Sequence, residues 1–217
     1  MIKHILNWLF KSSLYFLIEI PLILLGLPLV AIGIPFRDLP AIDGLRPFTD
    51  PRFLGRGYWA RVRLPRWLLW WDNPFDGLWG DKRGWWDNEC RRHGRTCEHP
   101  LSMWLWAAIR NPANYFSRCI VGCDVSRCVI RKLAGHDVVS GDAGKREWQF
   151  LVATDDRGRQ YHRLFISWAW PFKPERSLLI DIGWKVKLSH NGTAPDAMEQ
   201  DRYKGSVFTV SPWKDVS

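Results

Sequence analysis

Four side chains within ten residues have the donor types of a metal site. Cys90, His93, Cys97 and His99 would supply thiolates and imidazoles, the ligands that tetrahedral zinc prefers. Their spacing departs from the common zinc motifs, in which two ligand pairs are separated by a dozen or more residues. The pattern therefore favours an ordinary polar loop, with a zinc site as the alternative. Apart from zinc, no cofactor is expected.

The remaining candidate donors have simpler structural interpretations. Three further cysteines, Cys119, Cys123 and Cys128, are expected to pack as small apolar side chains, and an odd total of five favours a reducing compartment over a disulfide framework. Aspartates between residues 72 and 87 do not follow the calcium-loop pattern and suit turns. Since the sequence lacks the common nucleophile, phosphate-loop and metalloprotease motifs, it does not predict an enzyme.

These polar segments follow a long apolar stretch, Ser12–Phe36, in which Glu19 is the one acidic residue. Roughly 20 apolar residues cross a bilayer core as a helix. No small-residue cleavage site follows the stretch, so we expect residues 1–36 to be a retained membrane anchor. Its prolines permit either a single kinked span or a re-entrant hairpin bent near Pro21. The side chains expected in lipid are Leu14, Phe16, Leu17, Ile20, Leu24, Leu27 and Val30.

The charge is distributed unevenly about this anchor. The chain has 31 Lys and Arg against 22 Asp and Glu, and several arginines lie in a basic juxtamembrane loop over residues 37–57. The positive-inside tendency then places most of the chain in the cytoplasm. Anionic lipid headgroups are the favoured partner for this charge, ahead of nucleic acid.

Residues 58–124 form a tryptophan-rich region of predicted short helices and loops. Nine of the fifteen tryptophans lie between residues 58 and 106. Tryptophan favours the boundary between lipid and water, but a core built from large side chains explains the cluster equally well. Short helices are predicted over residues 64–71, residues 101–109 and after Asn111-Pro112. The residues assigned to the membrane interface are Trp8, Arg37, Trp67, Trp70 and Trp71.

The last part of the chain, residues 125–217, is predicted to be an antiparallel β-meander. Apolar and polar residues alternate over 148–154 and 162–170, on either side of the turn 155–158. A third strand, 178–188, carries Trp184 on its apolar face, and 206–210 is a candidate edge strand. Trp184 is a core residue if this face packs on the helix near Tyr115 and Phe116, and otherwise belongs to an exposed binding face. The fold class is α+β.

The order of these parts resembles a family of tailed-bacteriophage membrane-anchored proteins of unknown function. The similarity lies in the apolar N-terminus, followed by short motifs at Leu64–Trp67, Arg110–Ala113, Gly183–Lys185 and Ser211–Lys214. The resemblance implies a phage origin and the inner membrane of the host as the location. It brings no catalytic residues, because the family has no established activity.

Three functions follow as hypotheses. The first is a membrane-tethered accessory protein that binds an unidentified host or phage protein at the cytoplasmic face of the host inner membrane. The second is a virion-associated structural or ejected protein that inserts into the membrane during infection. The third is a membrane-bound, metal-dependent enzyme that uses the Cys/His loop or the aspartates near it.

Overall fold

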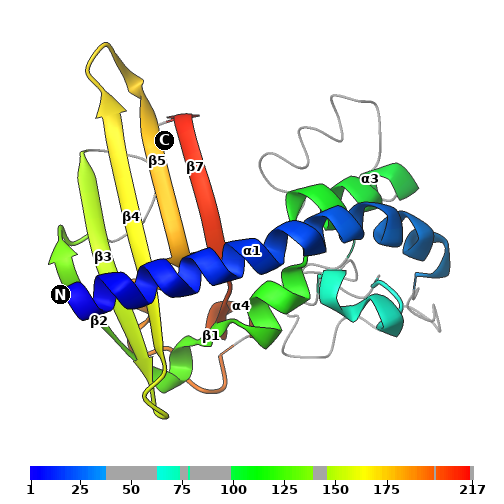
Figure 1. The fold of residues 1–217 in the computed structure, drawn as a ribbon, viewed down its shortest axis with the longest axis horizontal. Coiled ribbons are helices and arrows are strands. Elements are labelled where there is room, and N and C mark those ends of the chain that lie inside the picture. The colour runs from blue at the N-terminus through cyan, green and yellow to red at the C-terminus, as the bar shows by residue number, and fades with distance from the viewer. Residues whose placement is uncertain (38–62, 74–77, 79–98, 139–145, 198, 216–217) are drawn as a thin grey trace. The chain divides into compact units, whose positions relative to one another are not determined.

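The computed structural model describes residues 1–37, 63–73, 78, 99–138, 146–197 and 199–215 (Figure 1). The chain forms two compact units. The sheet unit combines Met1–Phe16 with Val121–Ser217, and the helical unit is Leu17–Ile120. Both units contain part of one long helix, and the antiparallel strands lie in the C-terminal part, so the α+β prediction is confirmed.

The long helix, α1, runs from Ile2 to Gly33 and is followed by the short 3-10 helix η1, Ile34–Phe36. Pro21 and Pro28 lie inside α1, and the chain stays helical through both. A proline removes one backbone hydrogen bond, which tertiary contacts can offset. One such contact lies next to Pro21, where Trp71 Nε1 donates to the backbone oxygen of Leu22 at 2.7 Å. Of the two alternatives, the re-entrant hairpin bent near Pro21 is therefore wrong, because α1 is continuous there.

The helical unit contains further short helical segments. Those predicted at 64–71 and 101–109 are confirmed in type and position. The sequence predicts that the helix after Asn111-Pro112 carries Cys123 on one face with Phe116 and Cys119, but its last residue is Ile120. Cys123 instead begins a strand. The segments are the 3-10 helix η4 (Arg66–Trp71), α3 (Pro100–Trp104) and the π-helical η5 (Leu105–Arg110) and η6 (Phe116–Ile120).

Two glycines allow η4 to approach α1 closely. A Cβ atom on Gly26 would lie 2.7 Å from Trp71 Cδ1, and one on Gly33 would lie 2.2 Å from Leu68 Cδ1. Gly26 and Gly33 are seven residues apart and therefore lie on one side of α1. Leu68 and Trp71 are both buried. The glycines thus have a packing role that their low helix propensity does not indicate.

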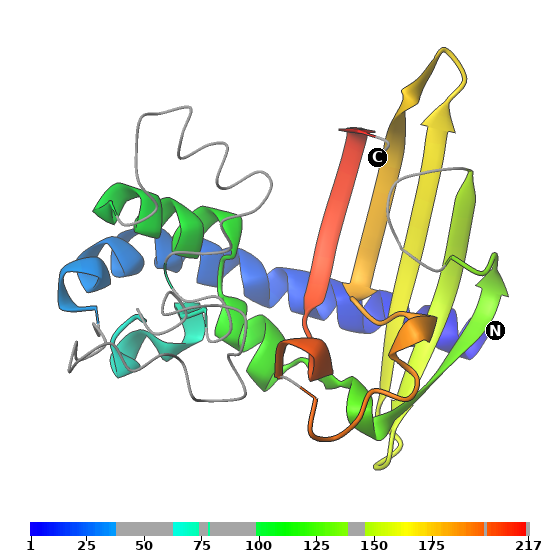
Figure 2. The same ribbon diagram turned by 180° about the vertical axis from the view of Figure 1, so that it is seen from behind.

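The sheet unit is built on a five-stranded antiparallel sheet with strand order β2-β3-β4-β5-β7. The first half of α1 crosses one face of the strands, and the segment that follows β5 lies on the opposite face (Figures 1 and 2). The predicted meander and its last edge strand are confirmed. The strands are β2 (Cys128–Gly135), β3 (Glu147–Asp155), β4 (Gln160–Trp170), β5 (Lys173–Trp184) and β7 (Ser206–Asp215).

Smaller elements complete this unit. A two-stranded sheet pairs β1 with β6, and it joins the start of the C-terminal part to its last third. The turn between β3 and β4 is fixed by Asp155, whose Oδ1 accepts hydrogen bonds from the backbone N–H groups of Arg157 and Arg159. The elements are β1 (Cys123–Asp124), η7 (Val125–Arg127), η8 (Leu188–His190), α4 (Glu199–Arg202) and β6 (Tyr203–Lys204).

The strand predicted over 178–188 changes face at Gly183. Ile182 pairs with Leu164 and Phe208 on the α1 side of the sheet, whereas Trp184 packs edge-on against Tyr161 on the other side. Gly183 has a φ of +109°, and a Cβ there would lie 2.1 Å from the oxygen of His162. Only glycine fits this position. The single continuous apolar face predicted for 178–188 is therefore wrong.

The core of the sheet unit lies on the side of the sheet that Trp184 faces. Trp184 is 6% exposed, and its Nε1 donates to the oxygen of Val121 at 2.8 Å, so Trp184 is a core residue. Its aromatic partner is Tyr161 rather than Tyr115 or Phe116. The core residues are Cys123, Val125, Ile130, Leu151, Ala153, Tyr161, Trp184 and Val186.

Candidate functional site

The first half of α1 turns its polar side chains towards the sheet. Lys11 Nζ donates to the backbone oxygen of Gln160 at 2.7 Å, and Asn7 Nδ2 donates to the Gln160 side-chain oxygen at 3.3 Å. One turn earlier, His4 Nδ1 lies 3.0 Å from Nε2 of His162, which is fully buried. These contacts join the helix to β4 through polar groups. An ordinary surface helix has the opposite arrangement, with its apolar stripe on the core.

The outer side of the same helical segment is apolar. Phe10 is 70% exposed and Leu6 is 61% exposed, although both lie among the most hydrophobic residue types. Lys3 and Ser13 are the polar residues on the exposed side of residues 2–16. The segment is thus amphipathic, with polar side chains that contact the sheet and apolar side chains that face away from it. We call this arrangement inverted polarity. The exposed apolar side chains are Ile2, Ile5, Leu6, Leu9, Phe10 and Leu14, and Phe16 is also exposed although its ring contacts Phe208 of β7.

The second half of α1, in the helical unit, has one buried side and one exposed apolar side. Leu22 and Val30 are buried against the unit, whereas Leu17, Leu24 and Ile32 are exposed. Among the residues predicted to lie in lipid, the exposed ones are Leu14, Phe16, Leu17, Ile20 and Leu24. Leu27 is half-buried and Val30 is a core residue. Within the described residues, α1 with η1 is the one helix long and apolar enough to cross a membrane.

The tryptophans of the helical unit divide between its core and its surface. Trp71 is buried and bonded to the Leu22 oxygen, and Trp104 Nε1 donates to the Leu27 oxygen at 2.7 Å. Trp67 and Trp70, by contrast, are exposed, although Trp70 also contacts the ring of Phe116. The core interpretation therefore holds for Trp71, whereas the assignment of Trp67 and Trp70 to a membrane interface stays a prediction. The tryptophans between residues 79 and 86 lie outside the described residues.

The other residues assigned to the interface make protein contacts. Trp8 Nε1 donates to the oxygen of Ile182 at 3.2 Å, and its ring meets Phe150 edge-on. The guanidinium of Arg37 donates to the oxygen of Ile34 at 2.9 Å. Trp8 thus fixes α1 to the sheet unit, and Arg37 closes the end of η1 in the helical unit. Residues 38–57 of the basic loop lie outside the described residues.

Beside α1, an apolar row crosses the same face of the sheet. Trp148 pairs with Ile166, Ile166 with Ile180, and Ile180 with Val210, so four neighbouring strands each contribute one side chain to one face. Trp148 and Val210 are exposed, and the other two are half-buried. We did not predict this row. Its signal in the sequence is that Trp148, Ile166 and Ile180 each lie on the apolar side of a predicted alternating strand.

An aromatic cluster lies at the end of the β4–β5 hairpin and of β7. Trp170 and Phe172 stack at 5.5 Å, and each ring lies within 6.4 Å of Trp213. Phe172 is 73% exposed, and Lys173 Nζ lies 5.5 Å from the centre of the Trp213 ring. Exposed rings next to a cation are typical of a membrane interface. Sequence reasoning assigned Trp170 to a strand and missed this cluster.

The zinc hypothesis is not tested by the described residues. Cys90, His93 and Cys97 lie outside them. His99 caps α3, because its Nδ1 accepts a hydrogen bond from the backbone N–H of Leu101 at 3.2 Å. In the part of the chain that the structure describes, no three His, Cys, Asp or Glu side chains are grouped as metal ligands. A zinc site in the 90–99 loop stays a prediction.

Comparison with known proteins gives one match. The model of a family of unknown function (DUF7338) matches residues 1–217. No curated protein and no solved structure matches the chain. The match confirms one part of the resemblance, namely that the chain belongs to a family of unknown function. The link to tailed bacteriophages stays a prediction.

Proposed function

Since the chain belongs to this family of unknown function, we propose its function from its own geometry: it is a membrane-associated protein that inserts the outer side of α1 into a lipid bilayer. The observation that carries this proposal is the inverted polarity of residues 2–16. Lys11 and His4 point to the sheet, and Leu6 and Phe10 point away from it. In water, each Å² of apolar surface that this arrangement leaves exposed has a free-energy cost of about 25 cal/mol.

Lipid explains this surface better than water does. Scattered apolar side chains are normal on soluble proteins, but contiguous apolar surface marks an interaction site. The half of α1 in the helical unit repeats the pattern, with Leu17, Leu24 and Ile32 exposed. The aromatic cluster at Trp170, Phe172 and Trp213 adds side chains that favour the headgroup region. A net charge of +9 suits anionic headgroups.

We propose that the insertion is one-sided rather than a complete crossing. Residues 2–16 belong to the same compact unit as residues 121–217, so the N-terminus and the sheet stay on one side of any bilayer. A crossing that includes residues 2–16 would require the contacts of His4 and Lys11 to break. At 32 residues, α1 is about 48 Å long and exceeds a hydrocarbon core of about 30 Å, so part of α1 lies outside that core in any arrangement. Helices lying in the membrane interface bury one apolar side in this way.

The side of the membrane, the host and the accessory role are proposed from the sequence. The arginines that follow α1 favour the cytoplasmic side for the sheet unit. The resemblance to tailed-phage proteins favours the inner membrane of a bacterial host. In that setting the protein would act as a tethered accessory protein, holding an unidentified host or phage protein at the membrane. Delivery with the virion is the alternative that mass spectrometry of purified particles would test.

The test uses the full-length protein and two variants of equal charge. Phe10→Asp places a carboxylate on the outer side of α1, and Ser189→Asp places one on an exposed position of the sheet unit. We expect wild-type protein and Ser189→Asp to sediment with anionic vesicles, and Phe10→Asp to bind at least about tenfold more weakly, as a charge at an apolar interface costs more than 1.4 kcal/mol. Equal binding by both variants, or a wild-type protein that stays in solution, would refute the proposal.

A further inference from the structure

Two cysteine thiols of the sheet unit lie next to each other. Cys123 is in β1 and Cys128 begins β2, and the short helix η7 returns the chain between them. Their sulfur atoms are 3.3 Å apart. Cys128 Sγ also lies 3.2 Å from the backbone oxygen of Asp124. The fold therefore brings together two thiols that the sequence spacing alone did not pair.

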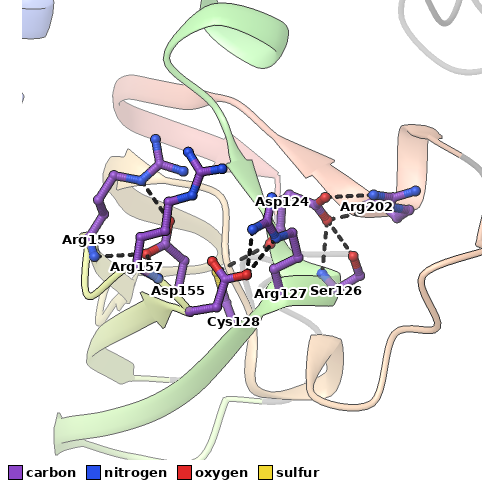
Figure 3. Close-up of polar contacts among 9 residues, drawn as sticks. Asp124, Ser126, Arg127, Cys128, Asp155, Arg157, Arg159 and Arg202 are labelled. Carbon is purple, nitrogen blue, oxygen red and sulfur yellow. Dashed lines mark hydrogen bonds and ion pairs between the residues drawn. The ribbon is translucent and has the colours of Figure 1, made fainter.

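The backbone on both sides of this thiol pair is fixed by charged contacts (Figure 3). Asp124 accepts from the backbone N–H of Ser126 at 3.1 Å and pairs with Arg202 at 2.6 Å. Asp155, the strand partner of Cys128, is held by Arg159 at 2.7 Å. The first contact pair joins β1 to η7 and to α4, and the second fixes the β3–β4 turn whose first residue pairs with Cys128.

The two thiols differ in access and in acidity. Cys123 is fully buried, whereas Cys128 is half-buried. The hydrogen bond from Cys123 lowers the pKa of the Cys128 thiol, against the opposing effects of burial and of Asp155. That same hydrogen bond, followed by burial, raises the pKa of the Cys123 thiol. A thiol that is more accessible and more acidic reacts first, and a buried neighbour is placed to react with the product.

We propose that Cys123 and Cys128 form a redox-active dithiol that a small-molecule disulfide oxidises reversibly to a Cys123–Cys128 disulfide. In the first step the Cys128 thiolate attacks one sulfur of the small disulfide. Its S–S bond breaks, a Cys128 mixed disulfide forms, and one small thiolate leaves and takes a proton from water. In the second step Cys123 gives its proton to water and attacks Cys128 Sγ, and the second small thiolate leaves and takes a proton from water. Two protein thiols are oxidised, and one disulfide is reduced to two thiols.

Little movement is needed for the second step. A disulfide bond is about 2.05 Å long, so the sulfurs must approach by roughly 1.3 Å from their present separation. The product would join β1 to β2 covalently and enclose η7. This dithiol is independent of the membrane surface of α1, so the two proposals can fail separately.

The experiment uses the full-length, detergent-solubilised protein. After reduction, it is incubated with oxidised glutathione, its remaining thiols are alkylated, and peptides are analysed by mass spectrometry with and without a reducing agent. We expect a transient glutathione adduct on Cys128, followed by a reducible cross-link between Cys123 and Cys128. Persistence of the adduct in the wild-type protein, or alkylation of both thiols throughout, would overturn the proposal.

Variants separate the two roles. Cys123→Ser should trap the glutathione adduct on Cys128, and Cys128→Ser should leave Cys123 without an adduct, because Cys123 is buried. Cys119→Ser removes a half-buried thiol of the helical unit and should leave the cross-link unchanged. A cross-link that involves Cys119 would contradict the assignment. The wild-type time course decides the outcome even if a variant fails to fold.

Discussion

Lys11 Nζ donates to the backbone oxygen of Gln160 at 2.7 Å, so a cation in a helix of otherwise apolar character points towards the protein's own sheet. His4 and Asn7 share this direction through their contacts with His162 and Gln160. The helix is therefore oriented by its few polar side chains. The exposed apolar side chains, such as Leu6 and Phe10, face away from the protein, and we propose that lipid covers them.

Replacing Lys11 should loosen the N-terminal half of α1. Lys11→Met keeps the length of the side chain but removes a charged hydrogen bond, typically worth about 1.5–3 kcal/mol net. We expect faster amide hydrogen exchange over residues 2–16. Lys3→Met is the matched control, because Lys3 is exposed on the same helix. Equal exchange in the two variants would show that Lys11 does not hold the helix on the sheet.

Gly26 is required for the close packing of η4 on α1. In Gly26→Leu, the Cβ would lie 2.7 Å from Cδ1 of the buried Trp71 ring, which cannot move without losing its bond to Leu22. Overpacking of this kind costs roughly 1–3 kcal/mol. Ala31→Leu, on the exposed side of α1, is the control. Thermal unfolding in detergent should show a lower melting temperature for Gly26→Leu alone.

Trp184 should contribute strongly to the stability of the sheet unit. Trp184→Ala removes its contact with Tyr161 and its hydrogen bond to Val121, and truncation of a buried tryptophan costs roughly 3–5 kcal/mol. The adjacent Lys185 is exposed, and Lys185→Ala should change stability by less than about 0.5 kcal/mol. Circular dichroism melts would compare the two. Unchanged melting of Trp184→Ala would contradict its place in the core.

Acid should destabilise the sheet unit through His162, which is buried, and His190, which is half-buried. Burial, and then the nearby His4 and Lys11, lower the pKa of His162 to about 4. Between pH 6.5 and pH 4 the unfolded chain binds a proton at this imidazole and the folded chain does not. Each pH unit in this window then removes up to about 1.4 kcal/mol of stability, with no effect above pH 6.5.

The contribution of His162 can be separated from that of His190. The pKa of His190 is also lowered to about 4, mainly by burial and then by Lys204, so both residues act in the same window. His162→Gln should therefore reduce the acid sensitivity without abolishing it. Urea unfolding of both proteins at pH 7 and pH 5 measures the difference. An unchanged pH dependence would show that protonation of His162 is not coupled to unfolding.

The α+β class, the long apolar helix and the β3–β4 hairpin were predictable from the sequence, because they depend on local periodicity and turn residues. Alternation between residues 148 and 170 was enough to find two strands, and Asp155 with Gly158 was enough to find their turn. The apolar length of α1 was likewise visible without any tertiary contact.

Which side of each element faces the protein could be seen only in the folded structure. Lys11 and His4 could be assigned to the inner side of α1 only once Gln160 and His162 were placed opposite them. Gly183 reverses the faces of β5 through a positive φ, which a period-two pattern cannot reveal. Cys123 and Cys128 come together because η7 reverses the chain between two strands. Periodicity fixes local geometry, whereas the environment of a side chain depends on residues distant in sequence, and here that environment defines both candidate sites.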